Sequence, residues 1–299
     1  MQWKPRHRMG AGLIMLLLLG LTLGGGLFVG SYDLGRAEVW EILLDRNHPQ
    51  AVILWDLRIP RLLLAFLSGC VLTLGGYFMQ ALIKNPLADP YIMGLTAGAG
   101  FGVNLLVLGL LPMFGIGALA WATPLAAGIG GLGSLLLVMG LGWRSMYEDS
   151  SRLLIAGVAA ASIFTALTGI LIYLKADSDQ IRQIVFWSFG SFHRANWLAV
   201  HLSIILALLT VIFGFTQARK LDLLALGDIH AQTLGLRVTR FKILLLVFTS
   251  LSVGGTVAFT GPIGFVGMMI PHFSRAIWGG LHRPNVVLGS LLGGTYLLA

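Results

Sequence analysis

Long apolar runs with almost no charged side chains make up most of this sequence. The clearest of them cover residues 9–30, 62–83, 119–143, 153–174 and 197–217. An α-helix needs about 20 apolar residues to cross the hydrocarbon core of a bilayer, whereas a barrel strand needs only about ten, in an alternating pattern. Only 11% of the residues are charged, against about 25% in an average soluble domain. The sequence therefore predicts an all-α polytopic membrane protein.

Further apolar segments bring the expected number of spans to about nine. A third span begins near Tyr91, a seventh covers 243–259, a short eighth covers 265–277, and a ninth starts at Val286 and runs to Ala299. Residues 1–299 are expected to form one transmembrane domain. The 40 glycines suit the close packing of helices in lipid.

The basic residues are distributed unequally between the loops. Lys4, Arg6 and Arg8 precede the first span, and most of the other cations fall in loops on the same side under this assignment. Cytoplasmic loops carry the excess of Lys and Arg, so we expect the N-terminus in the cytoplasm. The net charge of +8 is then a topology signal and does not indicate a nucleic-acid partner.

Residues 219–240 form the longest polar interruption in the second half of the chain. Basic residues in it outnumber its two acids, Asp222 and Asp228, and apolar residues recur through it. We interpret it as two short amphipathic helices with breaks at Gly227 and Gly235, lying at the cytoplasmic membrane surface. It either only fixes the topology or is a docking platform for a cytoplasmic partner.

The sequence lacks the residues and motifs that a proton-coupled carrier, an ATPase or a metalloenzyme needs. The spans as assigned contain no Asp, Glu or Lys, which disfavours a proton-coupled carrier, and no G-x-x-x-x-G-K-[ST] motif is present to bind ATP. The seven histidines show no metal-ligand spacing, and the single cysteine, Cys70, excludes a cysteine cluster. We predict no catalytic residue, metal or cofactor, with energy supplied by another subunit. A secondary transporter or channel that acts alone is the alternative.

Two polar groups beside the spans are candidate sites. Ser162, Thr165 and Thr168 recur at i, i+3 and i+6, where their hydroxyls either form one polar face of the fifth span or bond back to helix carbonyls. Arg58 and Arg61 stand at the external start of the second span. They either anchor that helix end among lipid headgroups or have a functional role at the outer face.

Several stretches, taken in order, match one family of transporters. They are Arg58-Ile-Pro-Arg61, Gly75-Gly76 with Gln80, Asn85-Pro-Leu-Ala88 with Pro90, Gly94 with Gly98, Ser151-Arg-Leu-Leu154, Ala156-Gly-Val158, Trp187 with Gly190-Ser191, Leu226-Gly227 with Ala231, Leu234-Gly235, Gly261-Pro-Ile-Gly-Phe-Val-Gly267, Pro271-His272, Arg275 and His282-Arg283. With these motifs the chain resembles, from about residue 10 to its end, the permease subunit of FecCD-type ABC importers for iron-siderophores, haem and vitamin B12.

The resemblance implies a large, type II permease of ten spans in the cytoplasmic (inner) membrane. It implies a homodimer or a pair of related permeases, two ABC ATPase subunits on the cytoplasmic face, and a periplasmic or lipid-anchored substrate-binding protein. Measured against that pattern, the chain has about nine spans, with the last truncated and the C-terminal span missing. The cargo stays open between iron-siderophore, haem and cobalamin, and an iron chelate is favoured because most family members carry one.

The resemblance also implies roles for particular residues. It assigns ATPase coupling to Leu226, Gly227, Ala231, Leu234, Gly235 and Arg237. Docking of the binding protein falls to Arg58 and Arg61. The cytoplasmic gate is expected near Ser150 and Ser151, on a translocation path that follows the Ser162, Thr165 and Thr168 face at the dimer axis.

Overall fold

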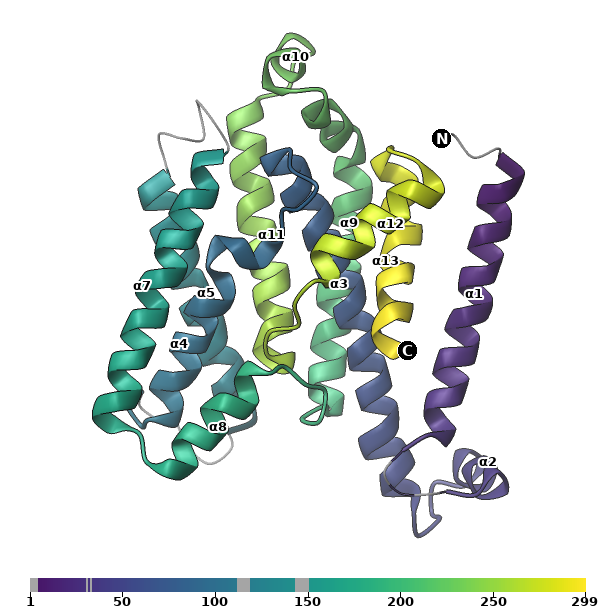
Figure 1. Ribbon diagram of the computed structural model, residues 1–299. Helices are drawn as coiled ribbons and strands as arrows, with labels where there is room; N and C mark the ends of the chain where they lie inside the picture. The colour runs from purple at the N-terminus through teal and green to yellow at the C-terminus, as the bar shows by residue number, and fades with distance from the viewer. Residues whose placement is uncertain (1–4, 31, 33, 112–118, 143–150) are drawn as a thin grey trace.

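The computed structural model describes residues 5–30, 32, 34–111, 119–142 and 151–299, and the regular structure in these ranges is helical (Figure 1). The first half contains α1 (Pro5–Phe28), α2 (Arg36–Leu44), the π-helix η1 (Ile53–Arg58), α3 (Ile59–Ile83), the 3₁₀ turn η2 (Pro90–Met93), α4 (Leu95–Val107) and α5 (Leu119–Gly142). The second half contains α7 (Ser151–Lys175), α8 (Ser178–Ser188), α9 (Trp197–Ala225), α10 (Asp228–Thr233), α11 (Val238–Thr260), α12 (Val266–Trp278) and α13 (His282–Leu298).

Helix α3 lies at the centre of the bundle. It contacts α9, α11, α12 and α13, and nearly all its side chains from Ser68 to Ile83 are buried. The π-helix η1 continues into α3, so the second apolar run is one helical segment over Ile53–Ile83. The expected start at Leu62 is therefore wrong. The helix extends further because Leu54 packs, fully buried, in a small apolar cluster with Val39 and Ile42 of α2.

Glycine brings α3 into backbone contact with two neighbouring helices. A Cβ placed on Gly69 would lie 2.2 Å from the carbonyl oxygen of Gly293 in α13, and one on Gly76 would lie 1.8 Å from that of Gly267 in α12. Only a residue without a Cβ fits at such distances. Lipid supplies no hydrophobic force between helices, so the close approach itself provides the attraction, through dispersion contacts.

The glycines that recur at four-residue spacing in the third span make similar contacts. Gly98 and Gly102 of α4 face α5, where a Cβ on Gly98 would lie 2.4 Å from the carbonyl oxygen of Gly130. Gly94 instead takes a left-handed conformation, with φ of 69°, at the N-cap of α4. The α-helix therefore starts at Leu95, after the η2 turn, and not near Tyr91 as expected.

Within the described ranges, six helical segments are long and apolar enough to cross a membrane. They are Gly10–Phe28, Ile53–Ile83, Ala122–Gly142, Leu153–Lys175, Trp197–Ala225 and Val238–Thr260. Helices α4, α12 and α13 have 13, 13 and 17 residues and fall short of that length. The expected count of about nine spans included these three and stays a prediction.

The segment 219–240 differs from the expected pair of short surface helices. Helix α9 continues without interruption to Ala225, so residues 219–225 are its C-terminal end. Only α10, of six residues, is a separate helix, and Gly227 and Gly235 bound it as expected. The α9 helix persists because Leu221 and Leu224 remain fully buried in the main core cluster with Val238 and Phe241 of α11.

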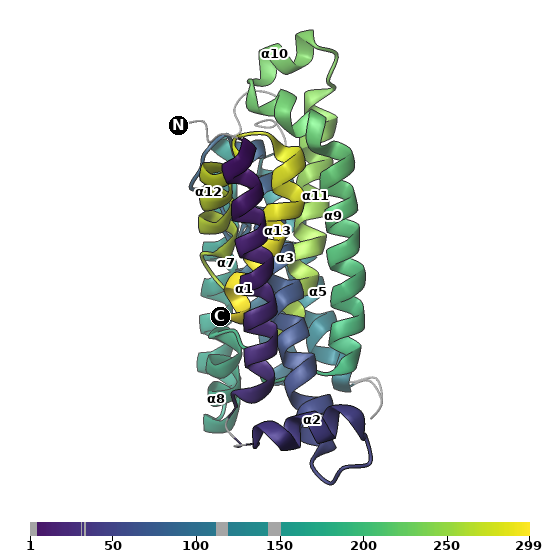
Figure 2. The ribbon, with the colours of Figure 1, turned by 90° about the vertical axis from the view of Figure 1, so that its right-hand side faces the viewer.

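The short helices mark the two ends of the bundle. Helix α10 projects beyond the bundle at the end where α1 begins, whereas α2 and α8 lie at the opposite end (Figure 1 and Figure 2). The basic residues predict that α10 and the start of α1 share one end of the bundle, as they do; that this end is cytoplasmic stays a prediction. Helix α1 runs along the edge, where its leucines are exposed and in a bilayer face lipid.

The glycine contact between α4 and α5 gives a direct test of this packing. A Cβ on Gly130 would lie 2.1 Å from the carbonyl oxygen of Gly98, whereas one on Gly128, two residues earlier in α5, would meet nothing within 4 Å. We expect Gly130→Ala to destabilise the protein by about 1–3 kcal/mol through overpacking. Gly128→Ala should be neutral or slightly stabilising. Thermal unfolding in detergent measures both, and equal stability of the two variants would contradict the contact.

Candidate functional site

The tip formed by α10 exposes apolar side chains. Leu226, Ile229 and Leu234 are 62%, 77% and 60% exposed, while Ala231 is fully buried against the core. Leucine and isoleucine side chains left exposed together on a projecting tip are typical of a surface that a partner covers. We call Leu226, Ile229 and Leu234 the tip patch. The sequence predicted Leu226 and Leu234 as contact residues, and both lie on it.

Two glycines set the shape of the tip. Gly227 has φ of 108° and Gly235 has φ of 85°, values in the left-handed region that glycine adopts readily. A Cβ on Gly235 would meet nothing within 4 Å, so this position needs glycine for its backbone and not for space. Arg237, which the resemblance also placed in the contact, is the N-cap residue of α11 and is exposed.

Asp228, the first residue of α10, is held by two lysines, a group we call the Asp228 clamp. Its Oδ2 accepts from Lys242 Nζ at 2.6 Å, and its Oδ1 forms an ion pair with Lys84 Nζ at 2.8 Å. Lys84 follows the last residue of α3, and Lys242 is 1% exposed in the first turns of α11. Partial burial alone would raise the pKa of the Asp228 carboxyl, but the hydrogen bonds from Lys242 and Lys84 outweigh it and lower that pKa. The sequence treated these residues only as loop charges.

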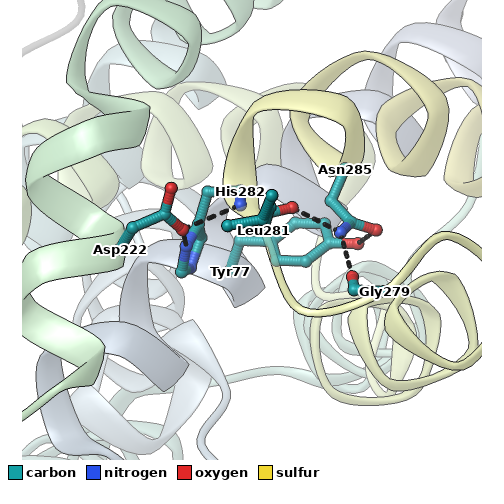
Figure 3. A network of polar contacts seen from close by, with 6 residues as sticks. All are labelled: Tyr77, Asp222, Gly279, Leu281, His282 and Asn285. Atoms are coloured by element: carbon teal, nitrogen blue, oxygen red, sulfur yellow. Dashed lines mark hydrogen bonds and ion pairs between the residues drawn. The ribbon is translucent and has the colours of Figure 1, made fainter. Parts of the chain in front are cut away.

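A second ion pair joins the C-terminal end of α9 to the start of α13 (Figure 3). Asp222 Oδ1 accepts from the backbone N–H of His282 at 2.9 Å and lies 2.6 Å from its Nδ1. His282 is buried, and its ring packs edge-on to Tyr77 of α3. The pair therefore connects α9, three residues before it ends, to α13 and α3.

Asn285 is the hub of the polar contacts beside this pair (Figure 3). Its Oδ1 accepts from Tyr77 Oη at 3.1 Å and from Ser274 Oγ at 2.6 Å. Its Nδ2 donates to the carbonyl oxygens of Gly279 and Leu281, at 2.6 Å each. This fully buried amide fixes the turn between α12 and α13 against α3.

Gln80 connects α3 to α12 one turn further along. Its Nε2 donates to the carbonyl oxygens of Gly267 and Met268, and its Oε1 accepts from the guanidinium of Arg275. Arg275 also stands over the ring of Tyr77, 5.3 Å from the centroid. The sequence matched Gln80, Arg275 and His282 to the family motifs without assigning them a role.

Arg58 and Arg61 occupy different environments. Arg58 is 8% exposed and donates to the carbonyl oxygens of Leu27, at 2.6 Å, and Tyr32. It therefore fixes the outer end of α1 against α3. Arg61 is exposed. Both side chains line one recess of about 710 Å³ beside the end of α1, in which Arg58 is buried by its carbonyl partners and Arg61 remains exposed.

The predicted hydroxyl residues of α7 also differ from one another in their hydrogen bonds. Ser162 Oγ donates to the carbonyl oxygen of Val158 at 2.9 Å, which is the back-bonded alternative. Thr168 Oγ1 instead accepts from Asn104 of α4 at 3.5 Å. Ser162 and Thr165 line an open recess of about 560 Å³ with Tyr91. Ser150 lies outside the described residues, as does the side chain of Ser151.

Comparison with known proteins identifies what this arrangement is similar to. The profile of the FecCD transport family matches residues 13–299. The hemin transport system permease protein HmuU of Yersinia pestis is 36% identical, over 99% of this chain and 86% of the relative. The vitamin B12 import system permease protein BtuC of Klebsiella pneumoniae is 38% identical, over 100% and 85%. The molybdate import system permease protein MolB of Haemophilus influenzae is 29% identical, over 98% and 86%.

A solved structure has the same fold. It is described as an inward-facing conformation of a metal-chelate type ABC transporter, and it superposes with a TM-score of 0.84 at 29% identity, covering 99% of this chain and 89% of that one. Among the described residues, no group of three or more His, Cys, Asp or Glu side chains could hold a metal ion.

The Asp228 clamp generates a prediction about local stability. We expect Asp228→Asn to speed hydrogen exchange at the amides of α10, because both lysines lose their ionic partner. The matched control is Asp179→Asn, whose carboxylate lies 4.0 Å from Arg182 with both side chains largely exposed. That surface pair should contribute almost nothing. Unchanged exchange in Asp228→Asn would show that the clamp does not hold the helix.

The same clamp has a defined pH dependence. The pKa of Asp228 is lowered from its ordinary 3.8, so its stabilisation is complete above about that pH and is lost as the pH falls through the lowered value. Protection factors of the α10 amides, which correct for the pH dependence of exchange in an unfolded chain, should therefore stay constant from neutral pH down to about pH 4 and fall at lower pH.

Proposed function

This chain belongs to the FecCD transport family and is an ABC importer permease subunit, and from that premise we propose that its cargo is an iron chelate. It is a multi-pass protein of the inner membrane, and ATP is hydrolysed on a partner chain. The names of the relatives include hemin, vitamin B12 and molybdate. Hemin is itself an iron chelate, and the matching solved structure is of the metal-chelate type, which supports an iron-siderophore or haem as cargo.

The tip patch supports docking of an ABC ATPase subunit on α10. Its exposed Leu226, Ile229 and Leu234 would enter a groove on the ATPase, with Arg237 at the edge of the contact. Gly227 and Gly235 give the tip its turns, and Ala231 packs it onto the core. The Asp228 clamp and the Asp222–His282 pair then connect a displacement of α10 to α3, α11 and α13.

Arg61 is the better candidate for docking the substrate-binding protein at the outer face. It is exposed at the outer end of α3, where an acidic side chain of a binding protein could reach it. Arg58 contributes by holding the outer end of α1 in place beneath that contact. Exposed ion pairs are worth about 0.2–1 kcal/mol, so the proposed pair would set orientation and association rate more than affinity.

The translocation path is proposed along the exposed face of α7, where a second permease copy would complete it. The face carries Ser162, Thr165 and Thr168, and exposed side chains run along most of the helix. Ser150 and Ser151, at the cytoplasmic start of α7, would form the gate. A homodimer or a pair of related permeases fits this face equally well.

Reconstitution tests the proposed function. The chain is to be co-purified with an ABC ATPase subunit and placed in proteoliposomes with a binding protein, and uptake of a radiolabelled ferric siderophore, haemin, cyanocobalamin and molybdate is measured with and without ATP. We expect ATP-dependent uptake of an iron chelate. Uptake that needs neither ATP nor the ATPase subunit would instead indicate a secondary transporter or channel acting alone.

Coupling through α10 is tested at Gly235. We expect Gly235→Val to abolish most ATP-driven uptake, because a β-branched residue does not tolerate φ of 85°. Gly235→Asn should lose much less, since asparagine adopts the left-handed conformation readily. Insertion into the membrane is checked for both. Equal uptake by the two variants would remove the proposed role of this turn.

Docking at the outer face is tested by charge reversal. We expect Arg61→Glu to slow binding-protein association about threefold or more at low salt, with the difference shrinking as salt increases. Arg182→Glu, an exposed arginine in α8, is the control. Arg58→Glu should instead reduce the yield of folded protein, because Leu27 and Tyr32 lose their donor. An Arg61→Glu variant that associates normally at low salt would contradict the docking role.

A further inference from the structure

A second recess, smaller than the one at Ser162, lies where four segments meet. It is open on one side and has a volume of about 340 Å³. Its walls are formed by α4, α7 and α8 and by Pro262 in the break at residues 261–264. Its polar lining side chains are Thr96, Asn104, Thr165, Thr168 and Ser188. The remaining wall is apolar, with the Trp187 ring standing against Gly100. The lining carries no charged side chain.

Asn104 is an unusual residue for its position. It lies in α4, in an apolar helix, and is 4% exposed. Its Oδ1 accepts no hydrogen bond from any residue in the described ranges, and its Nδ2 makes one long bond, 3.5 Å, to Thr168 Oγ1. A buried amide in a membrane protein normally has its hydrogen bonds satisfied, because an unmade one is costly in an apolar medium. Asn104 therefore retains unused hydrogen-bonding capacity at the wall of the recess.

Asn285 shows how the same side chain is treated when its role is structural. Both atoms of its amide are fully used, with two donors on Oδ1 and two acceptors for Nδ2, all within 3.1 Å. Asn285 is therefore a structural amide with all its hydrogen bonds made, whereas the hydrogen bonds of the Asn104 amide are only partly made among the described residues. Polar residues of this kind inside membrane spans are by default functional.

We propose that this recess is a polar subsite of the translocation path, in which Asn104 Oδ1, unpaired among the described residues, accepts from an N–H or O–H group at the edge of a metal chelate and the Thr168 hydroxyl donates to an oxygen of the same edge. The proposal rests on the proposed function and adds to it a chemical class. The hydroxyls of Thr96, Thr165 and Thr168 can donate to amide carbonyl or carboxylate oxygens, whereas the hydroxyl of Ser188 already donates to the carbonyl oxygen of Val185. Trp187 supplies a flat apolar wall for the body of the chelate. Because its described lining carries no charged side chain, the recess would bind the chelate only weakly. Weak binding lets the chelate leave the recess and continue along the translocation path.

The first experiment removes the polar atoms without changing volume much. Uptake of haemin, cyanocobalamin and a ferric hydroxamate is measured at subsaturating concentration in proteoliposomes of the assembled importer. We expect Asn104→Leu and Thr168→Val to slow uptake of the transported chelate about three- to tenfold, the factor that loss of one hydrogen bond produces. The control is Thr22→Val, whose hydroxyl bonds within α1 to the carbonyl oxygens of Leu18 and Leu19. Uptake by both recess variants at the Thr22→Val rate would overturn the subsite.

The second experiment reports occupancy without transport. In a Cys70→Ala background, Ser188→Cys places a thiol at the recess, and Ser178→Cys places one at the far, exposed end of the same helix. Labelling by a maleimide is timed with each of the three chelates present. We expect at least one chelate to slow labelling at 188 and not at 178, and Asn104→Leu to abolish that protection. Absence of site-selective protection by all three would overturn the subsite.

The two experiments keep the subsite distinct from the proposed function. ATP-independent uptake, or no ATP-dependent uptake of any chelate, would refute the proposed function, and the labelling result would still decide the subsite. ATP-dependent uptake that is insensitive to Asn104→Leu and Thr168→Val would refute the subsite alone.

Discussion

Backbone contact between α3 and its neighbours is the interaction on which the rest of this structure depends. Gly69 and Gly76 let α13 and α12 approach to distances that a Cβ would forbid. In a bilayer such contact replaces the hydrophobic force that joins helices in water. It also brings Tyr77 and Gln80 of α3 within reach of polar partners on α12 and α13. The close packing therefore comes first, and the polar network follows from it.

The polar network gives the bundle its mechanical connections. Polar groups inside a membrane protein must find partners within the protein, so each one that does so ties two elements together. Asn285 holds the α12–α13 turn, and His282 extends this group to Asp222 at the end of α9. Asp228 ties α10 to α3 and α11 by two short ion pairs. In the proposed function, a force applied to α10 would reach α3 and α11 directly through these ion pairs.

Particular residues show how far the sequence could predict the candidate sites. Leu226 and Leu234 are exposed at the tip as expected, because an amphipathic pattern next to glycine breaks reports surface position directly. Arg58 was predicted with Arg61, yet it is buried against the backbone carbonyls of Leu27 and Tyr32, which lie 31 and 26 positions away and which no local pattern places beside it. No local sequence pattern predicts the hydrogen-bond partners of Lys242, Asn285 and Asn104. Their roles depend on residues 14, 208 and 64 positions away.

The sequence by itself determined the all-helical membrane fold and the family, because hydropathy and ordered motifs are local properties of the chain. Only the tertiary structure decided where helices end and which polar groups meet. Helix α9 continues to Ala225 because Leu221 and Leu224 are buried by α11. Asn104 is left with unused hydrogen-bonding capacity while Asn285 is satisfied, although both lie in apolar helices. That difference arises from which other helices reach each amide, and helix packing in three dimensions sets it.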